Sequence, residues 1–366
     1  MTDTSSLQAA LAHHGLTRRD FLKFCSALTT LLALPGNAAA QIAASLWRKP
    51  KPPVVYLEFQ DCAGCTESLL RSPSPTIAQI VLSDVSLNYH ETIMAAAGKQ
   101  AEEAKQQTIR EGGYLLMVEG SIPVGTRAAC CIGGRSAVDL LKEAAAKAAA
   151  IVSVGNCACF GNIPAADPNP TGAVGVWDVV SGVSIVNMAG CPPNPANLAA
   201  LVAHFITFRD LPKMDNLNRP LFAYGGRIHD YCERRAHFDA GRYVEAWGDE
   251  GHRLGWCLYK MGCKGPATFH NCPSIRWNLA TSWPVGAGHG CVGCSEIRFW
   301  DRMTPFYERL PEAAVIHTKV DLNSIAKWMA VASAAGVAGH AVGSSIRGKL
   351  RSRDERKKQQ GETREK

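Results

Sequence analysis

Residues 54–65 read VVYLEFQDCAGC, an apolar and partly β-branched run that ends in two cysteines separated by two residues. A short apolar run of this kind is typical of a strand that is buried on both faces of a parallel sheet. Comparable runs recur at residues 114–119, 151–154 and 183–188. We therefore expect a parallel sheet whose first strand leads directly into a pair of cysteines.

Alanine-rich segments separate these runs and indicate crossover helices. The clearest are residues 136–149 and 195–208, and residues 82–110 are predicted to form a strand followed by a long helix. Repeated strand–helix–strand units predict a doubly wound α/β domain, which we place at residues 46–215.

Cysteines follow three of the four apolar runs. Cys62 and Cys65 follow the first run, Cys157 follows the third, and Cys191 follows the last. In doubly wound sheets, ligands bind beyond the carboxyl ends of the strands. The four thiolates should therefore converge, and tetrahedral sets of thiolates hold either zinc or an iron–sulfur cluster.

The α/β rhythm stops in the next region, at residues 216–312. This region is loop-rich, with frequent Gly, Pro, Trp and Cys, which indicates a domain organised around bound metal. Its candidate ligands, in chain order, are His229, Cys232, Cys257, Cys263, Cys272, Cys291 and Cys294. Spacing groups the first four in one site and the last three in another, with Pro284 at a vacant corner. A three-iron cluster needs only three thiolates, so the odd number is informative; zinc is the main alternative.

The other cysteines and histidines have no evident ligand role. Cys131 and Cys159 are predicted to be small buried apolar residues, and Cys130 has no predicted role. His229 itself is alternatively a structural residue. The remaining histidines expected on the surface or in packing include His204, His237, His252 and His289.

Both ends of the chain contain predicted targeting or anchoring segments. Residues 17–23 read TRRDFLK and precede an apolar run and a small-residue region, which predicts a twin-arginine signal peptide at residues 1–45. That route exports proteins that have already folded around their cofactors, so it weighs against disulfide bonds for the cysteines.

The C-terminal apolar segment, residues 323–347, is predicted to form a transmembrane helix, the alternative being a soluble amphipathic helix. It contains Gly339 and Gly343, a small-residue packing motif, and His340, an ionisable residue within the span. The basic cytoplasmic tail at residues 348–366 places the folded body on the periplasmic face of the cytoplasmic (inner) membrane.

The charge of the chain is concentrated in that tail. The formal net charge is +7, and residues 347–366 carry nine Lys and Arg against four Asp and Glu. The rest of the chain is close to neutral, so a nucleic-acid partner is not expected.

Several motifs together resemble the small subunit of membrane-bound nickel–iron uptake hydrogenases. The most specific stretches are DCAGCTES at 61–68, VEG at 118–120, GCPPNP at 190–195, RIHDYC at 227–232 and GWCLYKMGCKGP at 255–266. The resemblance runs from the N-terminal signal to the C-terminal segment. It implies a flavodoxin-like first domain, an iron–sulfur second domain, and two 4Fe-4S clusters and one 3Fe-4S cluster arranged as a wire.

The resemblance implies one set of ligands for each cluster. A proximal 4Fe-4S cluster would be held by Cys62, Cys65, Cys157 and Cys191. A distal 4Fe-4S cluster would be held by His229, Cys232, Cys257 and Cys263. A medial 3Fe-4S cluster would be held by Cys272, Cys291 and Cys294, with Pro284 at the vacant corner.

Two positions that are not cysteine bear on the proximal cluster. Oxygen-tolerant members of the family carry two additional cysteines there, and the corresponding residues of this chain are Gly64 and Asn162. The resemblance therefore implies an ordinary proximal cluster.

The implied activity is that of a hydrogenase subunit with no catalytic residue of its own. A separate large subunit, in a heterodimer or a multimer of it, would hold the nickel–iron centre that oxidises H₂. Electrons would then pass through the clusters to a membrane cytochrome b and quinone. Glu67 and Glu119, beside the proximal loops, either face the large subunit or make ordinary hydrogen bonds. The alternatives are the iron–sulfur subunit of another exported oxidoreductase and a zinc- or disulfide-stabilised exported binding protein.

Overall fold

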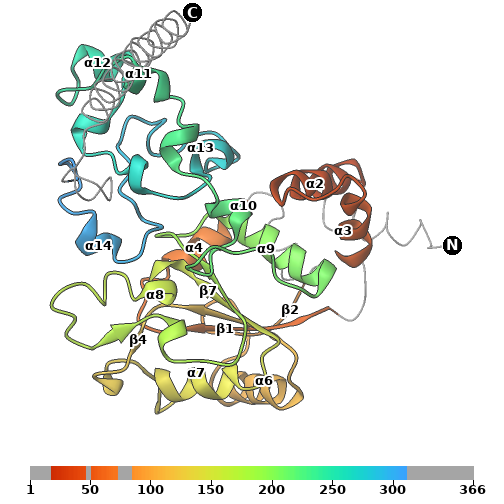
Figure 1. Ribbon diagram of the computed structural model, residues 1–366. Helices are drawn as coiled ribbons and strands as arrows, with labels where there is room; N and C mark the ends of the chain where they lie inside the picture. Colours follow the sequence, from red (N-terminus) through yellow and green to blue (C-terminus); the bar gives the residue numbers. More distant parts are fainter. Residues whose placement is uncertain (1–17, 47–50, 73–84, 311–366) are drawn as a thin grey trace, which may run out of the picture. The chain divides into compact units, whose positions relative to one another are not determined.

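The computed structural model describes residues 18–46, 51–72 and 85–310 (Figure 1). Its central element is a five-stranded parallel sheet with the strand order β2-β1-β3-β7-β9. The strands are β1 (Pro53–Glu58), β2 (Ser86–His90), β3 (Leu115–Glu119), β7 (Ala150–Val154) and β9 (Ile185–Met188). In chain order this is 2-1-3-4-5, the order of flavodoxin-like sheets.

The strands confirm the apolar runs seen in the sequence. Every residue of β3, β7 and β9 is buried, as expected for strands covered on both faces. The parallel register pairs Glu58, at the end of β1, with Glu119, at the end of β3. The carboxyl ends of these strands therefore lie side by side at one edge of the sheet.

Helices cover both faces of the sheet. On one face, alternate strand residues such as Val55, Leu57 and Leu116 pack against α6 (Gly98–Glu111) and α7 (Ala137–Ala145). On the other face, Tyr56 and Met117 pack against α9 (Pro195–Phe208). The alternation follows from the two-residue period of a strand. The α/β prediction is confirmed. Helix α7 ends at Ala145, four residues before the end that was predicted for the helix at 136–149.

Helices α7 and α9 begin at residues whose side chains cap them. Ser136 Oγ accepts a hydrogen bond from the Asp139 N–H at the start of α7. Asn194 Oδ1 accepts one from the Ala196 N–H at 3.0 Å, and Pro195 occupies the first turn of α9. Such caps satisfy backbone donors that the helix itself leaves unpaired.

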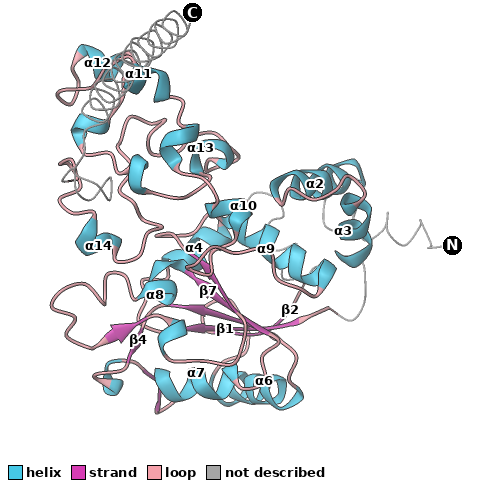
Figure 2. Ribbon diagram, in the orientation of Figure 1, coloured by secondary structure: helices cyan, strands magenta, loops and turns pink. Residues whose placement is uncertain are grey.

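Residues 219–310 consist mainly of loops joined to short helices (Figure 2). These helices are α10 (Leu221–Tyr224), α11 (Arg235–Asp239), α12 (Glu250–Arg253), α13 (Cys272–Ile275) and α14 (Phe299–Arg302), with 3₁₀ turns at Ile228–Tyr231, Tyr259–Met261 and Gly265–Ala267. A small core around Ile228, Val244, Leu258 and Trp283 packs against the cysteines of this region. Little regular structure holds these loops, as the sequence predicted.

The short elements of the first region flank the sheet. Helix α4 (Gly64–Leu70) follows β1, and α8 (Gly155–Phe160) follows β7. Two small two-stranded sheets pair β4 (Ile122–Pro123) with β8 (Ala173–Val174) and β5 (Cys131–Ile132) with β6 (Arg135–Ser136), and 3₁₀ turns lie at Arg127–Ala129 and Val176–Asp178.

The structure describes only part of the two end segments for which targeting or anchoring roles were predicted. Residues 18–46 form α2 (Arg18–Leu31) and α3 (Ala38–Leu46), whose buried side chains Leu28 and Ile42 belong to the same apolar cluster as α9. The predicted transmembrane segment at 323–347, with His340, and the basic tail lie outside the described residues. Within the described ranges, no helix is both long and apolar enough to cross a membrane.

Candidate metal centres

The first group of cysteines lies where the strands of the parallel sheet end. Cys62 and Cys65 follow β1, Cys157 lies in α8 directly after β7, and Cys191 lies in the loop after β9. Burial raises the pKa of Cys157 to about 12, and the neighbouring Cys191 and Cys62 thiols act in the same direction. Burial also raises the pKa of Cys65, as do Glu119, Cys157 and Cys191. Mutual electrostatic effects of this kind require that the four thiols lie close together.

A glycine makes room for this group. Gly155, at the start of α8, has a φ of +84°, and a Cβ at this position would collide with Cys65 Sγ. Only glycine adopts this backbone conformation without strain and leaves the space free. The turn between β7 and α8 can therefore pass directly beside the thiol.

Glu119 supports the loop that carries Cys65. Its carboxylate, 1% exposed, accepts hydrogen bonds from the backbone N–H groups of Cys65 and Thr66, each at 2.9 Å. It also accepts from Thr66 Oγ1 at 2.7 Å and from the Tyr56 hydroxyl at 2.9 Å. Glu119 thus makes the hydrogen bonds that were one of its two expected roles. Glu67 instead forms an exposed ion pair with Arg71 at 2.7 Å.

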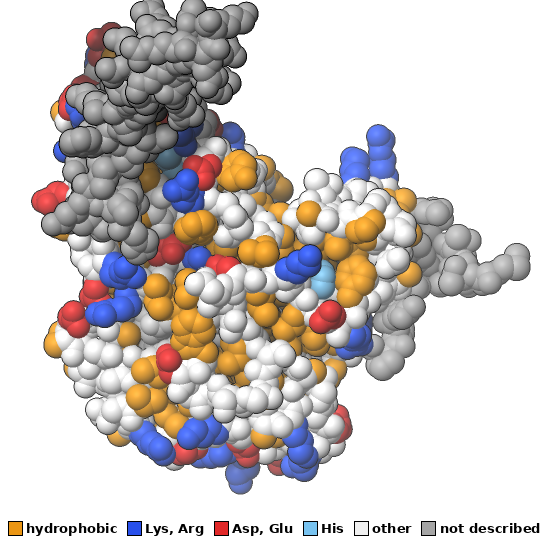
Figure 3. All heavy atoms as spheres, in the orientation of Figure 1, with side chains coloured by type: hydrophobic (Ala, Val, Ile, Leu, Met, Phe, Trp, Pro, Cys, Tyr) orange, Lys and Arg blue, Asp and Glu red, His pale blue; other side chains and the backbone are white. Residues whose placement is uncertain are grey.

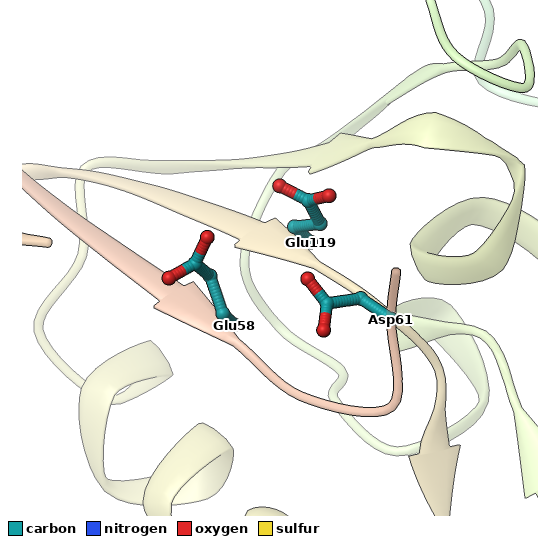
Figure 4. A group of neighbouring side chains, drawn as sticks. All are labelled: Glu58, Asp61 and Glu119. Atoms are coloured by element: carbon teal, nitrogen blue, oxygen red, sulfur yellow. The ribbon is translucent and has the colours of Figure 1, made fainter. Parts of the chain in front are cut away.

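Three carboxylates approach one another beside this loop: Glu58 at the end of β1, Asp61 in the following loop and Glu119 (Figure 4). One oxygen of each lies within 4.8 Å of the others. Burial, followed by the charge of Glu119, raises the pKa of Asp61 to about 6. Glu58 accepts from Thr92 Oγ1 at 2.6 Å, and Glu119 already has four donors. These acids form a hydrogen-bonded network, and the thiols beside them are the stronger metal-ligand set.

The second group lines one large cavity. Cys272, Cys291, Cys294 and Pro284 all contribute to its wall. Cys272 lies in α13, and the other two cysteines lie in the loop before α14. The structure therefore brings together the three thiols and the proline that spacing had grouped.

His270 stands directly beside this second group. Its Nδ1 lies 3.0 Å from Cys272 Sγ, and its side chain is almost fully buried. Burial, with a smaller effect of Arg219, lowers the pKa of His270 to about 4, so the ring is neutral at pH 7. His270 is among the histidines that were expected on the surface or in packing, although its position two residues before a candidate ligand was a usable signal.

The third group lines a separate, smaller cavity. Its members His229, Cys232, Cys257 and Cys263 come from a 3₁₀ turn and three loops. Burial and the guanidinium of Arg235 lower the pKa of His229, which keeps the imidazole in the neutral form that binds metal. The His229 ring packs edge-on against Phe238, with ring centroids 4.4 Å apart.

A buried arginine also belongs to the third group. Arg234 is 8% exposed, and its backbone N–H donates to Cys232 Sγ at 3.4 Å. Burial raises the pKa of Cys257 to about 11, and the Arg234 guanidinium opposes that rise. Arg234 thus places a positive charge beside a thiolate site. The sequence alone did not identify this residue.

Close approaches between neighbouring ligands connect the three groups in series. Cys191, in the first group, and Cys294, in the second, line the same cavity. Burial raises the pKa of Cys294 to about 11, and the charge of Cys191 acts in the same direction. The backbone N–H of Cys291, in the second group, donates to Sγ of Cys263, in the third, at 3.2 Å. Each junction therefore brings a candidate ligand of one group beside a candidate ligand of the next.

The remaining cysteines of the α/β region behave differently from one another. Cys159 is fully buried and contacts the Ser153 carbonyl oxygen at 3.5 Å, as predicted for a small apolar residue. Cys131 is exposed, so the prediction that it is buried was wrong. It lies in the two-residue strand β5, whose hairpin leaves that side chain uncovered. Cys130 is partly buried.

The donor chemistry of the three groups fits iron–sulfur clusters. The ten candidate cysteines are all free of disulfide bonds. Several thiols buried together have raised pKa values unless cations stabilise their thiolate forms. Sets of soft sulfur ligands select zinc or iron–sulfur clusters over hard cations.

Comparisons with known proteins agree along nearly the whole described chain. Residues 62–205 match the family described as NADH ubiquinone oxidoreductase, 20 Kd subunit, and residues 224–307 match the C-terminal family of the NiFe/NiFeSe hydrogenase small subunit. The hydrogenase-2 small chain of Escherichia coli is 49% identical over 77% of both chains. The uptake hydrogenase small subunit of Afipia carboxidovorans is 44% identical over 95% of both. A crystal structure of the Ni-Fe-Se hydrogenase from Desulfomicrobium baculatum matches with a TM-score of 0.67 and 32% identity, covering 71% of this chain and 99% of that one.

Proposed function

This chain belongs to the family of nickel–iron hydrogenase small subunits, and we propose that it conducts electrons from H₂ oxidation through three iron–sulfur clusters in series. It is a hydrogenase subunit, and the catalytic centre of such an enzyme lies on the large subunit. Its own contribution is to hold redox groups at fixed positions and to set their environments.

The observation that carries this proposal is the serial contact between the three cysteine groups. Cys191 and Cys294 line the same cavity, and the Cys291 N–H donates to Cys263 Sγ at 3.2 Å. Clusters bound at these ligands would be neighbours in the order proximal, medial and distal. In that order, electrons would enter at the first group, at the sheet edge, and would leave from the third group.

Each group has the donors that its proposed cluster needs. Cys62, Cys65, Cys157 and Cys191 would hold the proximal 4Fe-4S cluster, and His229, Cys232, Cys257 and Cys263 the distal one. Cys272, Cys291 and Cys294 would hold the medial 3Fe-4S cluster, with Pro284 in the wall where a fourth ligand would otherwise stand. The proposed α/β domain at residues 46–215 would carry the first set, and the proposed iron–sulfur domain at residues 216–312 would carry the other two.

The bound clusters would supply one-electron redox chemistry, and the chain's residues would adjust it. A hydrogen bond or a nearby positive charge stabilises the more negative, reduced form of a cluster. Arg234 and the neutral His229 act in this sense at the third group. His270 does so at the second group when its Nδ1 carries the proton. The distal position is therefore a favourable destination for electrons.

The proximal cluster is proposed to be of the ordinary four-iron type. Gly64 and Asn162 stand where two additional cysteines would be needed for a six-cysteine cluster. Cys130, Cys131 and Cys159 are not substitutes, because they lie at other positions, and Cys131 is exposed.

The partner would be a nickel–iron large subunit that covers the first group. Cys62 and Cys191 are exposed in the isolated chain. Apolar side chains are exposed over much of the face drawn in Figure 3, with Lys and Arg among them and at the edge.

The physiological setting is proposed from the chain ends. A twin-arginine signal at residues 1–45 would export the folded protein, and residues 323–347 would anchor it at the periplasmic face of the inner membrane. Electrons would then pass to a cytochrome b and to quinone.

Metal and sulfide analysis of the purified heterodimer with the large subunit tests the proposal. We expect iron and acid-labile sulfide in amounts that match two four-iron clusters and one three-iron cluster, without zinc. Stoichiometric zinc in place of iron and sulfide would contradict it. A Cys131→Ser variant serves as the control, because it removes an exposed thiol that has no ligand role and should leave the analysis unchanged.

A further inference from the structure

Asn162 occupies an unusual place beside the first cysteine group. It follows α8, the helix that carries Cys157, and its side chain is 3% exposed. Its φ of +45° lies in the left-handed region, which asparagine adopts more readily than most residues. Gly161, with a φ of +84°, ends the helix just before it. The backbone therefore fixes the direction in which this carboxamide points.

The carboxamide lies between two thiols that come from different loops. Asn162 Nδ2 is 3.4 Å from Cys157 Sγ and 3.6 Å from Cys191 Sγ. Both distances are suitable for N–H···S hydrogen bonds, which are longer than bonds to oxygen. One NH₂ group has two hydrogens, so it can donate to both sulfurs at once.

The oxygen of the amide makes no competing hydrogen bond, since Asn162 Oδ1 is buried and has no hydrogen-bond partner within the residues that the structure describes. Rotating the amide by half a turn would direct the oxygen at two sulfurs, and anionic thiolates accept hydrogen bonds but cannot donate them. The orientation with Nδ2 toward the sulfurs is therefore the favourable one once the thiols are ionised.

The effect on the thiols has a definite sign. The amide hydrogens of Asn162, which carry partial positive charge, are directed at both sulfurs. The amide thus stabilises negative charge on both sulfurs.

We propose that Asn162 is a positioning residue that raises the reduction potential of the proximal cluster by donating hydrogen bonds to Cys157 and Cys191. The inference rests on the proposed function, since it assumes that these cysteines hold a cluster. One-electron reduction adds negative charge, part of which resides on the ligand sulfurs, and hydrogen bonds to those sulfurs favour the reduced form. Asn162 also links the ligand from α8 with the ligand from the loop after β9.

Two variants of the assembled two-subunit enzyme test this inference. Asn162→Gly removes the donor at a backbone position that glycine adopts without strain. Asn162→Asp keeps the shape but replaces the NH₂ group with an oxygen that repels the sulfurs. The readout is the proximal midpoint potential in a redox-poised paramagnetic resonance titration, with the medial and distal potentials as internal references.

We expect Asn162→Gly to lower the equilibrium constant for proximal reduction about tenfold, a shift of about 59 mV for one electron. Asn162→Asp should lower it further, and the medial and distal potentials should not move. Asn218→Gly is the matched control. Asn218 also has a positive φ, +57°, but its backbone hydrogen bonds join Asp215 and Asn187 rather than a sulfur. The proximal potential of this control should equal that of the wild type.

The inference fails if both Asn162 variants retain the wild-type proximal potential. Should only one variant assemble with its cluster, its potential still decides the question. Asparagine labelled with ¹⁵N gives a second readout: hyperfine coupling between the reduced proximal cluster and a side-chain nitrogen should be present in the wild type and lost in Asn162→Gly. Absence of a proximal signal in the wild type would instead overturn the proposed function, so the two failures are distinguishable.

Discussion

His229 shows how one residue type changes an electron-transfer site. As a proposed ligand of the third group, His229 would place a neutral imidazole where the other ligands are thiolates, and burial favours the neutral form because it lowers the pKa of His229. The less negative ligand set stabilises the reduced cluster. The position of His229 and the neutral form of its ring would therefore both favour reduction of the proposed distal cluster.

Replacing His229 should slow electron exit. We expect His229→Gly to reduce H₂-driven reduction of an electron acceptor by about 10–100-fold, with the nickel site little disturbed. Paramagnetic resonance of the nickel site and of the distal cluster, with steady-state dye reduction, measures both effects. His237→Ala, at a half-buried histidine of α11, is the control and should retain wild-type rates. Unchanged dye reduction and unchanged distal spectra in His229→Gly would contradict the assignment.

Two cysteines of α8 should respond oppositely to substitution. Cys157→Ala should abolish the proximal cluster and lower acceptor reduction about 100-fold or more, because it removes a ligand. Cys159→Ala should leave all cluster signals in place and cost on the order of 1 kcal/mol of stability, since it only shortens a buried side chain. Cluster content and thermal unfolding distinguish the two. Loss of the proximal signal in Cys159→Ala would assign that residue a role that we do not give it.

At the residue scale, the sequence predicted which cysteines lie near one another. It predicted less well which other residues surround them. Cysteines that follow parallel strands meet because the strand ends share one sheet edge. By contrast, Arg234 and His270 reach their groups through loop paths that no periodicity reveals. Cys131 was predicted to be buried because cysteines usually are, but it lies in a short hairpin that leaves it exposed.

At the element scale, a buried arginine connects the end of the α/β region with the loop before α14. Arg219 forms ion pairs with Asp215 at 2.8 Å and Glu296 at 3.1 Å, and it donates to the Ser295 carbonyl oxygen at 2.9 Å. The Arg219 side chain is only 4% exposed. Ser295 follows the ligand Cys294, so this network holds the second cysteine group against the first region.

Removing that arginine should be costly. We expect Arg219→Met to destabilise the protein by about 3–5 kcal/mol, because two partly buried carboxylates lose their partner. Arg135→Ala breaks an exposed pair with Glu143 and should cost no more than about 1 kcal/mol. Thermal unfolding of the assembled enzyme, with medial-cluster content as a second readout, compares them. Equal, small losses in both variants would show that the buried network does not stabilise the fold.

Elements with strong patterns were predictable, and elements without them were not. Hydrophobicity predicted the strands β1, β3, β7 and β9, and the alanine-rich pattern predicted the whole of α9. The predicted helix at 136–149 was too long, because its last four residues turn toward β7. The short helices between residues 219 and 310 have too few residues to show a period, and ligand positions and packing determine their geometry instead.

At the scale of the whole molecule, the three cysteine groups form one series from the sheet edge through the loop-rich region. Spacing along the chain divided the ligands into sets, but it did not order them. The order follows from the contacts of Cys191 with Cys294 and of Cys291 with Cys263. These contacts join residues that are distant in the chain, so only the folded structure reveals them.

The most direct test of the central claim is a redox-poised paramagnetic resonance titration of the purified heterodimer under H₂. The account predicts one three-iron signal and two four-iron signals, with magnetic interaction between the medial cluster and each of its two neighbours. A heterodimer that shows fewer clusters, no three-iron signal, or interaction between the proximal and distal clusters alone would contradict it.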